Sequence, residues 1–300
     1  MKNRVFRLTT ILCAVTCLAF CVPAFAKDKV IEGLNSPESV ARVGKYLYVS
    51  NVGVKLAPNT KDGDGYIAKL DLDGNAVKKD FITGLDAPKG LVEMGNVLYV
   101  ADIDHLFGFD LKNGEKVFAL DLSAEKTVFL NDLAIEDNDH LFISATDINK
   151  IFQVDIKTKT YRDVGVTVSG PNGLWYDAKG KYLYVVGFAN QNGKASGEVG
   201  VVDLSRQPAE YQKIIDRPGF YDGLQPMSEG VFLVSDWVAF EPERGVLIRV
   251  NVKNRTFEVI PGAYGGPADF LYFRDKAGLY PPLLYIPRMI DGKLEIRTLK

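Results

Sequence analysis

Four oxygen-bearing side chains recur in the same local setting along this chain of 300 residues. Glu38, Asn131, Asn172 and Asp222 each stand second in a short segment that leads into an apolar stretch. Two carboxylates and two amide carbonyls are the ligands that a hard cation such as calcium prefers. None of these positions holds Cys or His, so zinc, copper and iron are poorly matched. The sequence therefore predicts a divalent cation, calcium before others, bound by these four residues and by water.

Each of these residues also has a simpler explanation. Asn and Asp before Gly are common turn residues, so Asn172 or Asp222 alone could serve only a turn. All four residues fall at the same point of a repeating unit, however, and this shared phase favours the metal site. Asn131 is counted both as a metal ligand and as a substrate contact.

Two further residues occupy the same point of the repeat and complete what we call the polar column: Glu38, Lys89, Asn131, Asn172, Asp222 and Ala268. An ammonium about 6 Å from a dication would be repelled by roughly 5 kcal/mol at an effective dielectric near 20. We therefore expect Lys89 to turn outward or to pair with a carboxylate, or else the site is not occupied by metal alone. Two roles remain open for it, a surface lysine at a strand entrance and a cation that anchors the substrate.

The column follows from six internal repeats, which begin 41 to 51 residues apart at residues 37, 88, 130, 171, 221 and 267. This spacing is typical of four-stranded propeller blades. Each start is followed by a second apolar strand, as in Tyr182 to Val185, and no helical periodicity is sustained after residue 26. We predict an all-β, six-bladed β-propeller over residues 27–300, with a seven-bladed ring or a sandwich as alternatives. A strand at Lys29 to Gly33 would complete the last blade and close the ring.

The second strand of each blade should end on the face that carries the column. Residues at or after these ends are therefore candidate substrate contacts, namely Asp102, His105, Asp236 and Arg288. His105 could be a proton shuttle or a solvated turn histidine. Three long loops, 52–65, 188–197 and 237–245, should form walls around the same mouth.

Residues 1–26 have the pattern of a secretory signal peptide: basic residues, an apolar run and an Ala-x-Ala site ending at Ala26. A membrane anchor and a lipoprotein attached at Cys21 are the alternatives. We expect a periplasmic or secreted monomer with no membrane span after cleavage. All three cysteines lie in this segment, so the mature chain has no thiol chemistry. Its net charge is 33 minus 38, or −5, after removal of Lys2, Arg4 and Arg7, which argues against nucleic-acid binding. The expected partner is a small-molecule substrate or ligand.

Asn131-Asp132-Leu133, Pro171-Asn172-Gly173-Leu174 and Asp222-Gly223-Leu224 resemble the metal-binding signatures of the senescence marker protein/gluconolactonase/luciferin-regenerating-enzyme-like superfamily. Diisopropyl fluorophosphatase and paraoxonase show a similar pattern. In gluconolactonases the first ligand Glu precedes a Pro, whereas here Pro37 precedes Glu38, as in strictosidine-synthase-like proteins. The resemblance covers the whole mature chain. It implies a six-bladed propeller that holds a divalent cation, usually calcium, at Glu38, Asn131, Asn172 and Asp222, with ester, lactone or phosphoester hydrolysis over it.

The chain has no Gly-x-Ser-x-Gly nucleophile elbow, which disfavours a serine-hydrolase mechanism. The hypothesis is a lactone or ester hydrolase in which the cation polarises the carbonyl and lowers the pKa of a bound water. Asp222, or Glu38 as second choice, would be the general base. The alternative is a propeller that binds a ligand or protein without catalysis, with a purely structural cation, because propellers host many functions.

Overall fold

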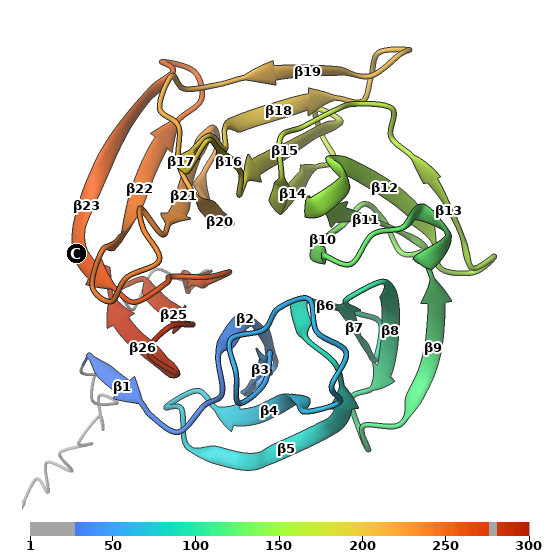
Figure 1. The fold of residues 1–300 in the computed structure, drawn as a ribbon, viewed down its shortest axis with the longest axis vertical. Helices are drawn as coiled ribbons and strands as arrows, with labels where there is room; N and C mark the ends of the chain where they lie inside the picture. The colour runs from blue at the N-terminus through green and yellow to red at the C-terminus, as the bar shows by residue number, and fades with distance from the viewer. Residues whose placement is uncertain (1–27, 276–280, 300) are drawn as a thin grey trace, which may run out of the picture.

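The computed structural model describes residues 28–275 and 281–299. Within these residues the chain forms six four-stranded antiparallel sheets and one two-stranded sheet. The four-stranded sheets are arranged as blades around a central axis (Figure 1), so the chain is a six-bladed β-propeller, as the repeats predict. The predicted signal peptide at residues 1–26 lies outside the described residues.

The first three blades follow one another in chain order. Blade 1 contains β2 (Pro37–Val43), β3 (Tyr46–Asn51), β4 (Gly65–Asp71) and β5 (Ala76–Leu85). Blade 2 contains β6 (Pro88–Met94), β7 (Val97–Asp102), β8 (His105–Asp110) and β9 (Lys116–Asp121). Blade 3 contains β10 (Leu130–Ile135), β11 (His140–Ala145), β12 (Lys150–Asp155) and β13 (Thr160–Asp163), and the short 3-10 helices η1 (Ser123–Glu125) and η2 (Thr146–Ile148) flank its first strands.

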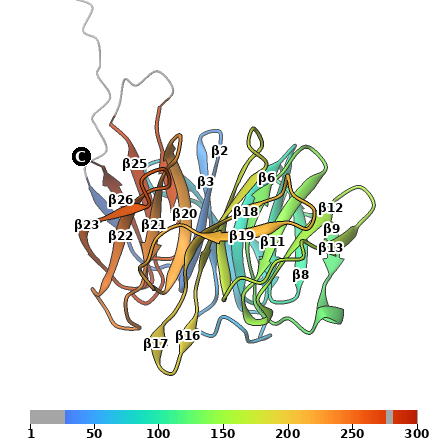
Figure 2. The ribbon, with the colours of Figure 1, turned by 90° about the horizontal axis from the view of Figure 1, so that it is seen from above.

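The remaining blades include a hairpin insertion and the closing strand. Blade 4 contains β14 (Pro171–Asp177), β15 (Tyr182–Gly187), β18 (Val199–Asp203) and β19 (Glu210–Lys213). Its insertion is the hairpin of β16 (Asn190–Gln191) and β17 (Lys194–Ala195), which projects from one face of the ring (Figure 2). Blade 5 contains β20 (Tyr221–Ser228), β21 (Val231–Asp236), β22 (Gly245–Asn251) and β23 (Thr256–Tyr264). Blade 6 contains β24 (Leu271–Phe273), β25 (Leu283–Arg288), β26 (Lys293–Thr298) and β1 (Lys29–Ile31).

The ring is closed by β1, which pairs antiparallel with β26 in the register Lys29↔Ile296 and Ile31↔Leu294. The N-terminal strand thus supplies the outer strand of blade 6, and the predicted closure is confirmed. This pairing covers an edge of β26 that would otherwise present unpaired backbone groups. Among the described residues no helix is long and apolar enough to cross a membrane.

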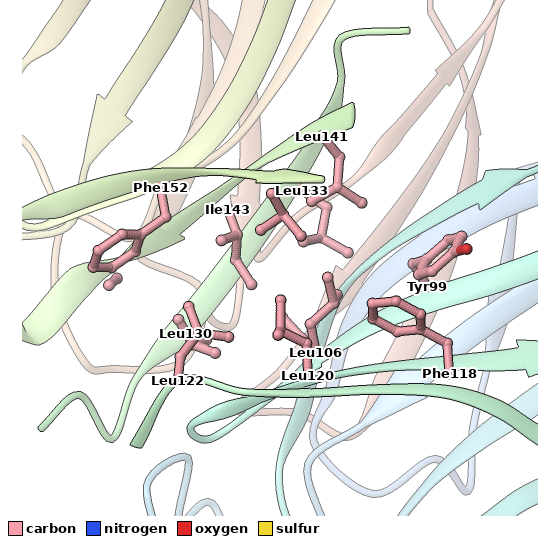
Figure 3. Close-up of a cluster of buried hydrophobic side chains, with 13 residues drawn as sticks. Tyr99, Leu106, Phe118, Leu120, Leu122, Leu130, Leu133, Leu141, Ile143 and Phe152 are labelled. Atoms are coloured by element: carbon pink, nitrogen blue, oxygen red, sulfur yellow. The ribbon is translucent and has the colours of Figure 1, made fainter. Parts of the chain in front are cut away.

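The hydrophobic core lies between neighbouring blades, because each sheet buries both faces. Figure 3 shows one such cluster between blades 2 and 3, where Leu106 and Leu120 meet Leu130 and Ile143. Tyr99 and Phe118 pack edge to face in the same cluster, with ring centroids 5.4 Å apart. Similar clusters repeat around the ring. They explain why the strands carry apolar side chains on both faces of each sheet.

The inner strands of five blades carry a β-bulge at their first residues. In blade 1, Pro37 pairs with Asn51 and Val40 with Val49, so two residues, Glu38 and Ser39, stand opposite one. The same shift recurs at the start of β6, β10, β14 and β20. A bulge removes residues from the regular ladder and redirects their side chains. The bulges therefore turn five of the six column residues away from blade-to-blade packing.

We expect Ile31→Asp to lower the free energy of unfolding by about 2 kcal/mol, because Ile31 is half-buried against the cluster that contains Leu294 and Ile296 and a carboxylate there would replace this apolar contact and be partly desolvated. Val30→Asp is the matched control, since Val30 lies on the opposite face of β1 and is 44% exposed. Denaturant unfolding of both variants checks this. Equal losses would contradict a role for the packed face of β1 in closure.

Candidate functional site

The structure brings the predicted ligands together at one end of the central axis. Glu38, Asn131, Asn172 and Asp222 line a single cavity of about 600 Å³, together with Lys89. All five side chains are buried, with exposed fractions of 1–4%. Ala268, the sixth member of the column, is buried but does not line this cavity.

One oxygen of each predicted ligand is buried and has no hydrogen-bond partner: Glu38 Oε2, Asn131 Oδ1, Asn172 Oδ1 and Asp222 Oδ1. Buried polar atoms are almost always paired, so four unpaired acceptors in one cavity require a common explanation. A divalent cation fits them, because oxygen atoms of carboxylates and amides are its usual ligands. Only two of the four residues are carboxylates, and within the described ranges no cluster of three or more His, Cys, Asp and Glu side chains forms a metal site by itself.

The local fold explains why these residues reach the axis. The bulge amide of Ser39 donates to Ser50 Oγ at 2.8 Å, and the amide of Asp132 donates to Ser144 Oγ at 2.9 Å. Ser144 Oγ in turn donates to the carbonyl of Asn172 at 2.8 Å. A buried serine on the second strand therefore satisfies the bulge and ties one blade start to the next.

Glycine follows the column residue where neighbouring blades approach most closely. A Cβ atom at Gly173 would lie 2.3 Å from the carbonyl oxygen of Asp222, and one at Gly90 would lie 2.6 Å from that of Asn131. These distances are shorter than any real contact, so a larger residue would force the blades apart. The Asn-Gly sequence that resembles a turn is thus a requirement of close packing.

Trp237 fixes the orientation of Asp222. Its indole Nε1 donates to Asp222 Oδ2 at 2.9 Å, which leaves Oδ1 as the unpaired oxygen. The indole is 4% exposed and also lines the cavity. One carboxylate oxygen is therefore held by the protein and the other is available to a ligand.

Charge at this site is poorly solvated. Burial raises the pKa of the Glu38 carboxyl well above its ordinary value, and Asp222 and Asp269 raise it further, whereas Lys89 lowers it. Burial and the charge of Asp269 also raise the pKa of Asp222, while the Trp237 hydrogen bond lowers it. Both carboxyls would be stabilised in the charged form by a cation between them.

Lys89 lines the cavity and is 1% exposed, so it is not the surface lysine that the sequence left open. Its ammonium donates to the carbonyl of Ala87 at 2.9 Å and lies 4.6 Å from the centroid of the Phe129 ring. Burial lowers its pKa to about 8, although Glu38 and Asp102 raise it in part. Among the described residues no carboxylate lies within ion-pair distance of this ammonium, so the expected pairing with a carboxylate is not formed.

Asp132 and Asp269 form a second polar layer, one residue further along the inner strands than the column. The sequence predicted no role for either residue. Asp132 accepts the amides of Leu133 and Leu174, both at 2.7 Å. Asp269 accepts the Ser39 hydroxyl at 2.5 Å through Oδ2, and its Oδ1 is buried without a partner. Both residues line a separate cavity that opens toward the other end of the axis. In the sequence, Asp132 and Asp269 each directly follow a residue of the polar column. This shared position was the signal that could have identified them.

Two of the predicted substrate contacts serve the backbone instead. Asp102 accepts the amides of Asp86 and Ala87 at 3.0 and 2.7 Å. Asp236 accepts the amide of Phe220 at 3.0 Å and forms an ion pair of 2.6 Å with Arg217. Neither lines the cavity. Each aspartate ends the second strand of its blade, and its side chain binds the loop that leads into the first strand of the same blade. We therefore do not retain them as substrate contacts.

The other two predicted contacts also lie outside the cavity lining. His105 Nδ1 is 2.7 Å from Asp104 Oδ1, and Asp104 Oδ2 is 2.6 Å from Lys61. Arg288 forms ion pairs with Asp291 and Glu295. The His105 cluster instead fastens the loop between β3 and β4, which carries cavity residues 56 and 58.

All three long loops contribute to the cavity wall. They supply Leu56 and Pro58, then Phe188, and then Trp237 and Phe240. Phe188 and Phe240 have ring centroids 5.8 Å apart, and each packs against Trp237. The sequence indicated these loops as walls, but the packing of their aromatic residues against one another depends on tertiary contacts.

Solved structures of low sequence identity share this fold. Virginiamycin B lyase from Staphylococcus aureus is 13% identical, with a TM-score of 0.59 and an alignment that covers 91% of this chain and 100% of that one. A protein of unknown function from Bacteroides thetaiotaomicron is 11% identical, with a TM-score of 0.63 over 92% of this chain and 72% of that one. Hydrazine synthase from Kuenenia stuttgartiensis is 13% identical, with a TM-score of 0.59 over 86% of this chain and 75% of that one. No family model matches the sequence, and no curated protein matches it. These likenesses show the propeller fold alone.

With a chelator present, we expect the buried Asp269 to make the folded state less stable as the pH rises. Burial raises its pKa from 3.8 to about 7, so its contribution to stability is full below about pH 4 and is lost as the pH rises through about 7. The loss should be on the order of a few kcal/mol. Thermal unfolding of the native chain and of Asp269→Asn between pH 4 and 8 measures it as a difference. The exposed Asp216 supplies the control Asp216→Asn, and a variant difference that is independent of pH would refute the shift.

We expect calcium to raise the melting temperature by about 5 °C or more at saturating concentration, because only the folded chain presents the four oxygens. Asn172→Leu and Asp222→Asn should each remove most of this increment. Asp147→Asn is the matched control, since both Asp147 oxygens in the same cavity already accept bonds from Thr127 and Val128. An increment that survives in Asp222→Asn would exclude this site as the origin of the effect.

Proposed function

We propose that this chain is a metal-dependent hydrolase of the lactone or ester type that acts at the mouth of the central channel. The observation that carries the proposal is the set of four unpaired buried oxygens in one cavity. The resemblance of the Glu38, Asn131, Asn172 and Asp222 segments to gluconolactonase-like signatures supports the same reaction class. Calcium is the proposed cation, because the donor set consists only of oxygen.

The roles of the chain's own residues follow from their contacts. Glu38, Asn131, Asn172 and Asp222 would hold the cation, which when bound supplies Lewis acidity toward a carbonyl oxygen and lowers the pKa of a water. Trp237 keeps Asp222 Oδ1 directed to the cavity by holding Oδ2. Asp222 would accept the proton of the attacking water as general base. The apolar wall would exclude other water from the reacting carbonyl.

A binding role without catalysis is the second candidate. It is favoured by the absence of histidine from the cavity lining, since neither His105 nor His140 lies there. In that case the cation would only hold the four blade starts together, and the cavity would retain a ligand unchanged.

A panel of lactones, aryl esters and phosphoesters distinguishes the two functions. We expect hydrolysis with calcium, loss of turnover with a chelator, and a fall of kcat of about 100-fold or more in Asp222→Asn, which removes both the general base and a ligand of the cation. Asp147→Asn should keep its activity. Calcium-dependent stabilisation without turnover on any member of the panel would favour the binding role, and unchanged kcat in Asp222→Asn would refute the mechanism.

A further inference from the structure

The two sides of the main cavity differ in chemical character. On the side of blades 4 to 6, four apolar side chains, Phe188, Trp237, Phe240 and Met289, line the cavity beside the predicted ligands Asn172 and Asp222. Phe240 is 60% exposed, although large aromatic side chains are usually covered in a folded chain. An exposed aromatic ring that belongs to a packed aromatic cluster is the kind of surface that ligands and partners cover.

The opposite side carries a cation with unused hydrogen-bonding capacity. An ammonium has three protons to donate, and Lys89 donates one, to the Ala87 carbonyl. The described part of the chain places no carboxylate within ion-pair distance of it. Glu38 and Asp147 line the same cavity, and the charge of Glu38 acts on Lys89 more strongly than that of Asp147. The two Asp147 oxygens accept bonds from Thr127 Oγ1 at 2.6 Å and from the Val128 amide at 2.8 Å. A buried cation without a partner is costly unless a ligand supplies the counter-charge.

We propose that the cavity binds an amphipathic carboxylate, with an aromatic or apolar group against Phe188 and Phe240 and its carboxylate on the Lys89 ammonium. The volume of about 600 Å³ is within the usual range for a small-molecule site. The cavity wall would cover the apolar group, and the ammonium would gain the partner that it lacks. This assignment rests on the proposed function in one respect, because a substrate would also need an ester or lactone carbonyl placed over the four ligands.

A carboxylate has a second potential partner in the same cavity, namely the cation held by Glu38 and Asp222. The two sources are separable, because chelation removes the cation and leaves Lys89 in place. The binding measurement is also separate from turnover. Failure to hydrolyse any ester would refute the proposed function, whereas failure to bind the probes refutes the ligand class.

The probes are 4-phenylbutyrate, its neutral amide 4-phenylbutyramide, and butyrate, which lacks the ring. Binding is measured by calorimetry and by fluorescence of Trp237 in a Trp175→Phe background, since these are the two tryptophans of the chain. We expect 4-phenylbutyrate to bind at least tenfold more tightly than the other two probes, with calcium and with chelator. Lys89→Met should abolish the preference for the carboxylate over the amide, and Lys89→Arg should keep it.

Phe240→Ser should weaken both ring-bearing probes equally and leave butyrate unchanged. Thermal unfolding of each variant shows that it is folded. The proposal is overturned if the carboxylate preference persists in Lys89→Met, if it disappears with chelator and so belongs to the cation, or if the native chain binds none of the probes.

Discussion

An imbalance of buried charge at the central axis is the constraint on which the rest of the structure depends. Four carboxyl groups, Glu38, Asp132, Asp222 and Asp269, are buried there, and Lys89 is the one basic residue among the buried polar side chains of the described chain. The pKa of each of the four carboxyls is raised, and burial is the first cause in every case. An apolar core would have been easier to stabilise. Such an arrangement is typical of functional sites, where local stability is given up for chemistry.

The scaffold separates the residues that must be rigid from those that can vary. The polar column sits on bulges that are satisfied by Ser50, Ser144 and Ser235 from the neighbouring strands. The apolar wall instead comes from loops between the second and third strands of blades 1, 4 and 5. Strand-borne ligands are held in place by a network that spans several blades, whereas loops tolerate changes in length and sequence. Trp237 is the exception, because this loop residue also holds the ligand Asp222.

Much of the fold was predictable because its signals repeat. Six phased starts gave the number of blades, and the closing strand followed from the count of strands in blade 6. The convergence of Glu38, Asn131, Asn172 and Asp222 followed from the same phase. Asp102 and Asp236 lie outside the cavity lining, and the sequence could not show this because a carboxylate that closes a loop and one that binds a ligand look alike in sequence. The cluster of Phe188, Phe220, Trp237 and Phe240 could not be found, since it joins loops whose relative position only the folded ring defines.

The pairing of Lys29 with Ile296 has a consequence for the order of assembly. Strand β1 is synthesised early, and it has no partner until β26, near the end of the chain, has been synthesised. By loop-closure entropy, bringing such distant segments together costs only roughly 2–3 kcal/mol more than joining adjacent strands, but it cannot happen early. The ring can therefore close only once β26 is present, and a chain that lacks β26 leaves β1 without a partner strand.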